Sequence, residues 1–527
     1  MNERVPWKKM SITSCMVKPI IDQSFSPSYK YAVHQLKGIC TPDVPSRLLQ
    51  YQTATHDTCM AALTAAALQF TVRRQPAVLV APAAPTPREL KRLSDVDDQE
   101  GLRLQVPFIM FYRRDTSTED GRDPARVIRD AISKALVHYY PFAGRLRELE
   151  GRKLAVDCNG KGILFIEANA DVCLEQFGDA LHPPFPCFEE LLFDVPGSSA
   201  ILDAPLLLVQ VTRLTCGAFV LAVRLNHTVA DAPGLVRFLR AVAELARGAA
   251  VLTVQPVWLR EILEARNPPR PSFAHREYDD GVIVPVQLKD DMEQVQRSFL
   301  FGPPEVAAIR ARLPPHLRKS SSTFEIITGS LWKCRTMALS PDAEEETRLM
   351  FAVSAGQQGG KTRLRVPDGY YGNTIVYPVA ISKAGELRAR PVGYAVELVR
   401  KAKEQVNAEY AQSVADLMAL RGRRPGFALG RHGFMVSDFT RLGFTDLDYG
   451  WGRPVYAPSA KGYIIASFLG PLTNSKGEDG VVVPMCLPGP AMDRFVEEMG
   501  KLVRLPVDVS AAKQPPGVLL PAKMSAL

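Results

Sequence analysis

The most informative part of the sequence is Asn226-His227-Thr228-Val229-Ala230-Asp231-Ala232-Pro233-Gly234. It follows an apolar run at 219–225 that predicts a buried strand, and Pro233 is typical of the first turn of a helix. His227 is therefore expected at a strand end that faces a cleft or a loop. A histidine in such a place titrates near neutral pH and can accept a proton from a hydroxyl or an amine.

Asp231 is too close in sequence to His227 to act as an independent acid opposite the same substrate. We expect it to cap the helix or to pair with an arginine, and so to hold the turn that aims His227. The spacing His-x-x-x-Asp is common, and taken alone it is equally compatible with a loop histidine beside a helix cap.

Helices and strands alternate on both sides of this stretch. A strand is predicted at 206–211, a helix opens at Asp123-Pro124, and the helix after Asp231 is expected to stop at Gly248. Residues 249–290 read as a connection. The second half repeats the mixture, with helices near 304–312, 324–336 and 392–408 and strands near 374–380. This order predicts a mixed α/β protein in two halves.

Length and composition limit the function classes. The 527 residues are enough for two domains of roughly 200 residues each. Hydrophobic residues make up 46%, but no apolar run reaches the length of about 20 that a membrane span needs. The net charge of +8 is spread without blocks of like charge, so we expect neither a membrane span nor a nucleic-acid partner.

The nine cysteines are scattered and form no Cys-x-x-Cys pair. This pattern argues against a disulfide framework and against structural zinc, and we predict no metal site. No secretory signal stands near Met1, so a cytoplasmic protein is expected.

Two segments differ from the rest. Residues 1–66 show no sustained period, and Met60 could itself be a start, so we interpret 1–59 as a dispensable or spurious extension and 1–66 as disordered. The glycine-rich 356–362 superficially resembles a phosphate loop, but Ala355 stands where its first glycine is required, and a surface loop is expected. The predicted domains are then 67–248 and 296–527, with 249–295 as the connection.

A second motif lies near the C-terminus: Asp448-Tyr449-Gly450-Trp451-Gly452-Arg453-Pro454. Two glycines around a tryptophan predict a tight turn with a large apolar anchor, which is a structural element.

The two motifs, in this order, resemble those of the plant BAHD acyltransferase family, which carries Asp-Phe-Gly-Trp-Gly at the second place. Further stretches match the family at 140–146, at Tyr370-Tyr371-Gly372-Asn373 and at 483–488. The resemblance runs from about residue 68 to about residue 510. Within the family the chain is most similar to alcohol acyltransferases of the benzoyltransferase type, on the stretches 79–87, 225–234 and 258–270.

The resemblance implies an α/β fold of two chloramphenicol-acetyltransferase-like domains, joined by a long crossover, with a channel between them and the histidine at its centre. It also implies that a segment just before Asp448 returns to the first domain. Acyl-CoA would enter one face as co-substrate and a small alcohol or amine the other, with no bound cofactor, and the chain would act as a monomer. The acyl group would be benzoyl, acetyl or hydroxycinnamoyl.

By the same resemblance, His227 is the general base that deprotonates the acceptor hydroxyl for attack on the acyl-CoA thioester, and Asp231 positions it. The family assigns a structural role, away from the reacting atoms, to Asp448, Tyr449, Gly450, Trp451 and Gly452. It places beside acyl-CoA or the channel the residues Tyr371, Gly372, Asn373 and Ser437.

Two residues depart from the family pattern. Tyr449 replaces its phenylalanine, so that a buried hydroxyl needs a hydrogen-bond partner. Ala232 stands where many members have glycine, although this variant also occurs in the subgroup. Cations of the glycine-rich loop region could meet the CoA phosphates or be solvated: Lys361, Arg363 and Arg365.

Two other functions stay open at this point. The same base would serve N-acylation of an amine, and a catalytically silent member could keep the fold to bind a ligand. A condensation domain of a peptide synthetase fits poorly, because Asn226 stands where an extra histidine is expected.

Overall fold

The structure is a computed structural model that describes residues 68–114, 121–178, 181–193, 201–280, 293–356, 364–423, 425–473 and 477–504. The chain divides into two compact units, Met1–Asp57 and Thr58–Leu527, and every described residue belongs to the second. The predicted extension at 1–59 lies outside the described residues, as do Lys361 and Arg363 of the glycine-rich loop. Arg365 is described and exposed.

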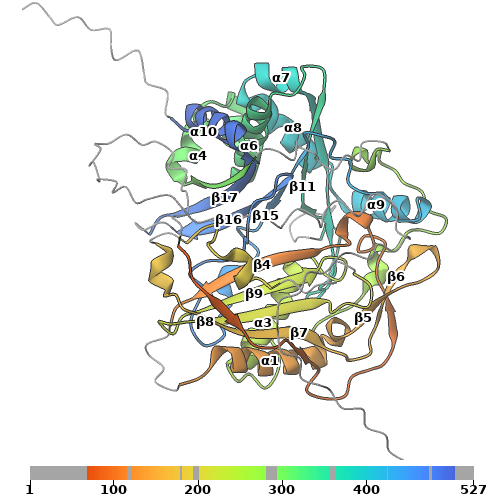
Figure 1. The fold of residues 1–527 in the computed structure, drawn as a ribbon. Coiled ribbons are helices and arrows are strands. Elements are labelled where there is room, and N and C mark those ends of the chain that lie inside the picture. The colour runs from red at the N-terminus through yellow and green to blue at the C-terminus, as the bar shows by residue number, and fades with distance from the viewer. Residues whose placement is uncertain are drawn as a thin grey trace, which may run out of the picture. The chain divides into compact units, whose positions relative to one another are not determined.

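The first half is built on a six-stranded sheet of order β1-β7-β8-β9-β4, with β2 also paired to β7 (Figure 1). Its strands are β1 (Val72–Arg74), β2 (Val78–Val80), β4 (Gln105–Tyr112), β7 (Ile163–Ala170), β8 (Leu207–Leu214) and β9 (Phe219–Asn226). The β7–β8 pair is parallel and the other pairs are antiparallel. The strands predicted at 206–211 and 219–225 are confirmed as β8 and β9. Both are buried along nearly their whole length, because both faces of the sheet are covered.

Two helices pack on one face of this sheet (Figure 1). They are α1 (Pro124–His138) and α3 (Ala232–Ala246). Each begins at an aspartate N-cap followed closely by proline: the Asp123 carboxylate accepts from Arg126 N at 3.2 Å, and Asp231 caps α3 in the same way. The predicted stop at Gly248 has φ +87°, a left-handed conformation that glycine adopts without strain. A small sheet of β3 (Leu90–Arg92), β6 (Leu154–Asp157) and β5 (Arg145–Glu148), and α2 (Phe188–Leu191), complete the half.

The second half is built on another six-stranded sheet, of order β10-β17-β16-β15-β11-β14. Its strands are β10 (Gln294–Phe301), β11 (Glu346–Phe351), β14 (Val379–Lys383), β15 (Phe434–Asp438), β16 (Ala466–Thr473) and β17 (Asp479–Pro488). Its helices are α4 (Pro303–Ala311), α5 (Pro315–Ser320), α6 (Thr323–Leu339), α7 (Ala384–Ala389), α8 (Val392–Glu404) and α10 (Gly489–Val503). Their apolar side chains and those of one sheet face form a second core around the fully buried Trp332. Among the described residues, none of the helices has both the length and the apolar character that crossing a membrane requires.

One predicted element of the second half was wrong in its bounds. The helix predicted at 392–408 ends at Glu404, because the Asn407 side chain accepts from Tyr410 N at 2.8 Å and so caps a new helix, α9 (Ala408–Leu420). The strands predicted near 374–380 are observed as β13 (Ile375–Val376), which pairs with β12 (Val353–Ser354), and β14. Pro378 separates them, because it has no N–H to donate to a ladder.

Residues 439–460, between β15 and β16, pack on the first half. Phe439, Phe444, Tyr449 and Trp451 belong to the core of the first sheet and its helices. The backbone of Tyr456 accepts from Phe111 N on β4 at 3.0 Å. The expectation that a segment before Asp448 returns to the first domain is therefore confirmed, and the predicted span 296–527 contains a piece of the other core.

Candidate active site

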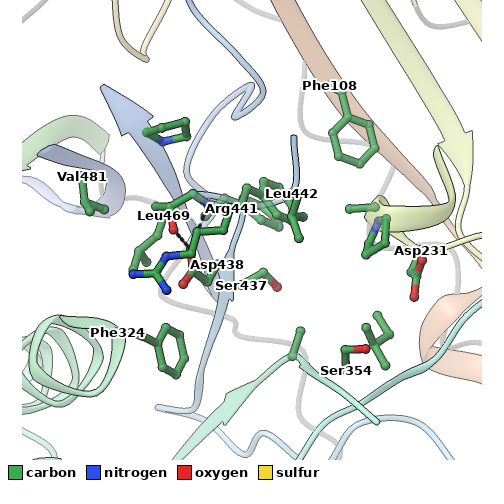
Figure 2. A pocket seen from close by; sticks show the side chains of 18 of the residues that line it. Phe108, Asp231, Phe324, Ser354, Ser437, Asp438, Arg441, Leu442, Leu469 and Val481 are labelled. Carbon is green, nitrogen blue, oxygen red and sulfur yellow. Dashed lines mark hydrogen bonds between the residues drawn. The ribbon is translucent and has the colours of Figure 1, made fainter. Parts of the chain in front are cut away.

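A cavity of about 1960 Å³ is lined by residues of both halves. Figure 2 shows Phe108 and Asp231 on one side of it and Phe324, Leu469 and Val481 on the other. Aromatic side chains are frequent in its wall: Phe108, Phe301, Phe324, Tyr370, Tyr377, Phe427, Phe439, Tyr456, Tyr463 and Phe468. A large concave cavity rich in aromatic side chains is the usual form of a small-molecule site.

His227 follows the last residue of β9 and lines this cavity. The turn is fixed by Asn226, whose amide oxygen accepts from Thr228 Oγ1 at 2.7 Å, and by His227 N, which donates to Leu104 O at 2.9 Å. The ring is half-buried, and burial lowers the pKa of His227 from its ordinary value of 6.5. The imidazole is therefore neutral at pH 7, with a lone pair free to accept a proton.

Asp231 is buried and accepts hydrogen bonds from two different halves of the fold. Its Oδ1 accepts from Gly234 N at 2.9 Å, which caps α3, and its Oδ2 accepts from Thr374 N at 3.0 Å. Burial raises the pKa of Asp231 and these two N–H donors oppose that shift. Of the two roles that the sequence left open, the helix cap is the one observed.

Residues 373–374, which are bonded to Asp231 through Thr374 N, also contact His227. Asn373 Oδ1 lies 3.1 Å from His227 Nδ1, and Asn373 Nδ2 donates to His227 O at 2.9 Å. Asn373 Nδ2 also donates to Asp97 Oδ1 at 2.8 Å. Asp97 in turn forms a buried ion pair with Arg260, at 2.9 Å.

Sequence reasoning missed Asp97 and Arg260. Asp97 is in the run Ser94-Asp95-Val96-Asp97-Asp98-Gln99, and Arg260 follows Trp258 in the connection. Three carboxylates in six residues usually indicate a solvated surface, whereas this run is buried. The one indication of burial in the sequence is the apolar Val96 among the acidic residues. That pattern does not predict which residue pairs with Asp97, and Arg260 is 163 positions away.

The other predicted channel residues separate into two groups. Gly372 and Ser437 line the cavity. Tyr371 and Asn373 are not among the lining residues. The Tyr371 ring packs instead against Tyr139, at 5.0 Å between centroids, and against Phe142 and Trp258.

The second motif forms a turn in the core of the first half. Asp448 Oδ1 accepts from Gly450 N at 2.7 Å and from Gly452 N at 2.9 Å, and both glycines have positive φ, +102° and +78°. The Trp451 ring meets Phe219 edge-on at 5.5 Å between centroids. The Tyr449 ring is fully buried, and within the part of the chain that the structure describes its hydroxyl has no hydrogen-bond partner.

One group of potential metal ligands lies close together among the described residues. The ligand atoms of Cys173, Glu175 and Cys216 lie within 4.8 Å of one another. All three are absent from the cavity wall, and Glu175 is exposed. The group therefore has no part in the chemistry at His227.

Comparison with known proteins agrees with this architecture. Residues 70–502 match the Transferase family. The chain is 56% identical to benzyl alcohol O-benzoyltransferase of Nicotiana tabacum over 455 residues, 84% of this chain and 96% of the relative. It is 52% identical to alcohol acyl transferase 1 (allele GSa) of Malus domestica over 438 residues, 82% of this chain and 95% of the relative.

Two solved structures share the fold. Vinorine synthase aligns with a TM-score of 0.61 at 23% identity, over 82% of this chain and 98% of its own. TRI101 of F. sporotrichioides, complexed with coenzyme A and T-2, aligns with a TM-score of 0.58 at 15% identity, over 77% of this chain and 96% of its own. The predicted two-domain α/β fold is thus confirmed.

Proposed function

The chain belongs to the Transferase family, the BAHD acyltransferases, and from this premise we propose that it transfers an acyl group from acyl-CoA to the hydroxyl of a small alcohol, with His227 as the general base. The observation that carries the proposal is the position of His227, neutral and half-buried in the wall of a large cavity between elements of both halves.

The proposed reaction needs one base and no covalent enzyme intermediate. His227 Nε2 accepts the proton of the acceptor hydroxyl while the oxygen of that hydroxyl attacks the thioester carbonyl carbon. The tetrahedral oxyanion then collapses, the C–S bond breaks, and the CoA sulfur leaves with the proton that His227 returns. The products are an ester and free CoA, and the histidine is again neutral.

The cavity wall supports an aromatic or short acyl group and a small alcohol. Phe108 and Phe439 from one side, and Tyr377 and Phe427 from another part of the wall, offer apolar contact to both substrates. Of the two curated relatives named above, one is a benzyl alcohol O-benzoyltransferase and the other an alcohol acyl transferase by name. We therefore propose benzoyl, acetyl or hydroxycinnamoyl donors.

Acyl-CoA is proposed as a diffusing co-substrate, without a bound prosthetic group. We propose that its phosphates contact cationic side chains of the wall, of which Lys403 is also paired with Glu325 at 2.6 Å. These side chains are Arg237, Arg310, Lys403, Arg441 and Arg453. Asp448 to Gly452 would support the domain arrangement only. We also propose that the protein is a monomer and that it is cytoplasmic. The six described cysteines are all free thiols, which agrees with a reducing compartment.

The test is CoA-thiol release by the full chain with benzoyl-, acetyl- and coumaroyl-CoA, each against a panel of alcohols and a matched panel of amines. We expect release that requires an alcohol and yields the ester by mass spectrometry. Release that is independent of the acceptor would indicate thioester hydrolysis, and release with amines alone would establish N-acylation. Either result would overturn the proposal.

A further inference from the structure

We propose that Asn373, anchored by Asp97, fixes the tautomer of His227 and thereby presents Nε2 as the base. Asn373 and Asp97 are positioning residues in this account, because they act through the histidine. The inference rests on the proposed function. It assigns to Asn373 a role other than the channel contact expected from sequence.

The first step is the orientation of the Asn373 amide. Its Nδ2 lies 2.8 Å from Asp97 Oδ1 and 2.9 Å from His227 O, and both of these oxygens can only accept. The backbone N–H of Asn373 donates to the same Asp97 oxygen at 3.0 Å. The NH₂ group must therefore face Asp97, and the amide oxygen must face the imidazole.

The second step is the proton on the imidazole. Asn373 Oδ1 is an acceptor only, and it lies 3.1 Å from His227 Nδ1. A hydrogen bond there requires the proton on Nδ1, which leaves the lone pair on Nε2. The network thus selects one of the two neutral tautomers, the one that can accept a proton from the substrate through Nε2.

The third step is the rigidity of the anchor. Asp97 is fully buried, and its carboxylate accepts from Arg260 Nη1 at 2.9 and 3.1 Å and from Ser94 N and Oγ at 2.9 and 2.7 Å. Arg260 Nη2 donates to Val229 O at 2.7 Å, inside the His227–Asp231 turn itself. The ion pair is charged and shielded from water, so its geometry is well fixed.

Gly372 has no side chain because the network occupies that space. A Cβ at this position would overlap the Arg260 guanidinium and approach the Tyr370 hydroxyl. Gly234, at the first turn of α3, likewise has no room for a Cβ beside the Tyr371 carbonyl. Both glycines let the 371–374 segment approach the histidine turn closely enough for the Asn373 bonds.

Asp231 has a different role from Asp97. Its two oxygens are occupied by Gly234 N and Thr374 N, and among the described residues it makes no hydrogen bond to the imidazole. Asp231 therefore holds the backbone of the 373–374 segment, and Asn373 holds the ring. One segment of the second half thus contacts both residues of the His-x-x-x-Asp motif.

The experiment compares Asn373→Ala, Asp97→Asn and the double variant with the wild type of the full chain. Asn373→Ala should lower kcat about 10–100-fold with KM for acyl-CoA within about 2-fold, because a wrong tautomer impairs proton transfer more than binding. It should also move the acidic limb of the kcat/KM profile to lower pH, since the bond from Asn373 raises the pKa of His227.

The double variant tests the connection between the two residues. If Asp97 acts through Asn373, Asp97→Asn should reduce kcat in the wild-type background and have little further effect once Asn373 is alanine. The matched control is Asn407→Ala, which removes the α9 cap away from the cavity and should leave kcat and the pH limb unchanged. Unchanged kcat and limb in Asn373→Ala, or fully additive losses, would overturn the inference.

The tautomer of His227 can also be measured directly by NMR, without enzymatic turnover. This measurement tests the inference even if the Asp97→Asn variant fails to fold. The chain has eight histidines, and ¹⁵N-histidine labelling with His227→Ala as the assignment variant isolates the signals of His227. We expect the Nδ1–H tautomer in the wild type and a mixture in Asn373→Ala. If His227 of the wild type carries its proton on Nε2, the inference is overturned. Failure of the proposed function would be seen separately, as wild-type protein that shows no acceptor-dependent thiol release.

Discussion

The two motifs of this chain are built alike but differ in what they present. In each, an aspartate side chain accepts backbone N–H groups of its own turn: Asp231 from Gly234, and Asp448 from Gly450 and Gly452. The first turn directs an imidazole toward a cavity of about 1960 Å³. The second packs the Trp451 ring against Phe219 in a core.

The difference shows that a carboxylate-stabilised turn is a generic way to fix a backbone, and the side chain it carries decides the function. His227 is polar, half-buried and next to empty space. Trp451 is apolar and buried, and the guanidinium of Arg122 lies 5.4 Å from its ring. We therefore expect substitutions in the first turn to change the rate, and substitutions in the second to change the stability.

The largest effect on rate is expected from His227→Ala. Removing a general base typically costs about 10²–10⁴-fold, so kcat/KM should fall by that factor while the melting temperature stays close to that of the wild type. The measurement is acceptor-dependent thiol release, with circular dichroism as the control for folding. A decrease in kcat/KM of less than about 10-fold would contradict the assignment of the chemistry to the first turn.

Trp451→Ala should have the opposite profile. Loss of a buried tryptophan costs about 3–5 kcal/mol of unfolding free energy, because a cavity remains beside Phe219. Chemical denaturation measures this loss, and kcat per folded molecule should remain within a few-fold of the wild type. A stable variant with a strongly reduced kcat would place the second motif in the chemistry.

Gly452→Ala isolates the backbone of the second turn. A Cβ at Gly452 would meet no atom within 4 Å, so only the φ of +78° is unfavourable to alanine. The expected loss is about 1–2 kcal/mol of unfolding free energy. Gly489→Ala, at a glycine without positive φ and with only Val295 Cγ2 in ordinary contact, is the matched control and should cost less.

Tyr449→Phe should have the smallest effect. The Tyr449 hydroxyl is buried and has no hydrogen-bond partner among the described residues, so its removal should leave stability unchanged or raise it by about 1 kcal/mol. Tyr112→Phe is the contrast, because that hydroxyl donates to Leu447 O at 3.0 Å and its loss should destabilise. Destabilisation by Tyr449→Phe would indicate a partner for its hydroxyl in solution.

The sequence was sufficient for the features that depend on neighbouring residues. Local residue types and periodicity predict the helix caps at Asp123 and Asp231, the strands β8 and β9, and the helix stop at Gly248. The helix that was predicted to continue to 408 shows the limit of this reasoning, since one asparagine side chain redirected the backbone at Asn407.

The rest of the site depends on contacts that no local pattern encodes. Asp97, Arg260 and Asn373 come from three distant parts of the chain and meet only because residues 249–280 and 364–380 cross beside the His227 turn. Their charges and amides would be unremarkable on a surface. Burial makes them specific partners, and burial is a property of the folded chain.

The most direct test of the general base is the pH dependence of kcat/KM for alcohol acylation. A base must be unprotonated to act, and burial lowers the pKa of His227 below 6.5. The wild type should therefore be fully active at pH 7 and lose activity as the pH falls through a single limb below about 6.5. The residual activity of His227→Ala should lack this limb, and a limb that persists in that variant at the same midpoint would contradict the assignment of His227 as the base.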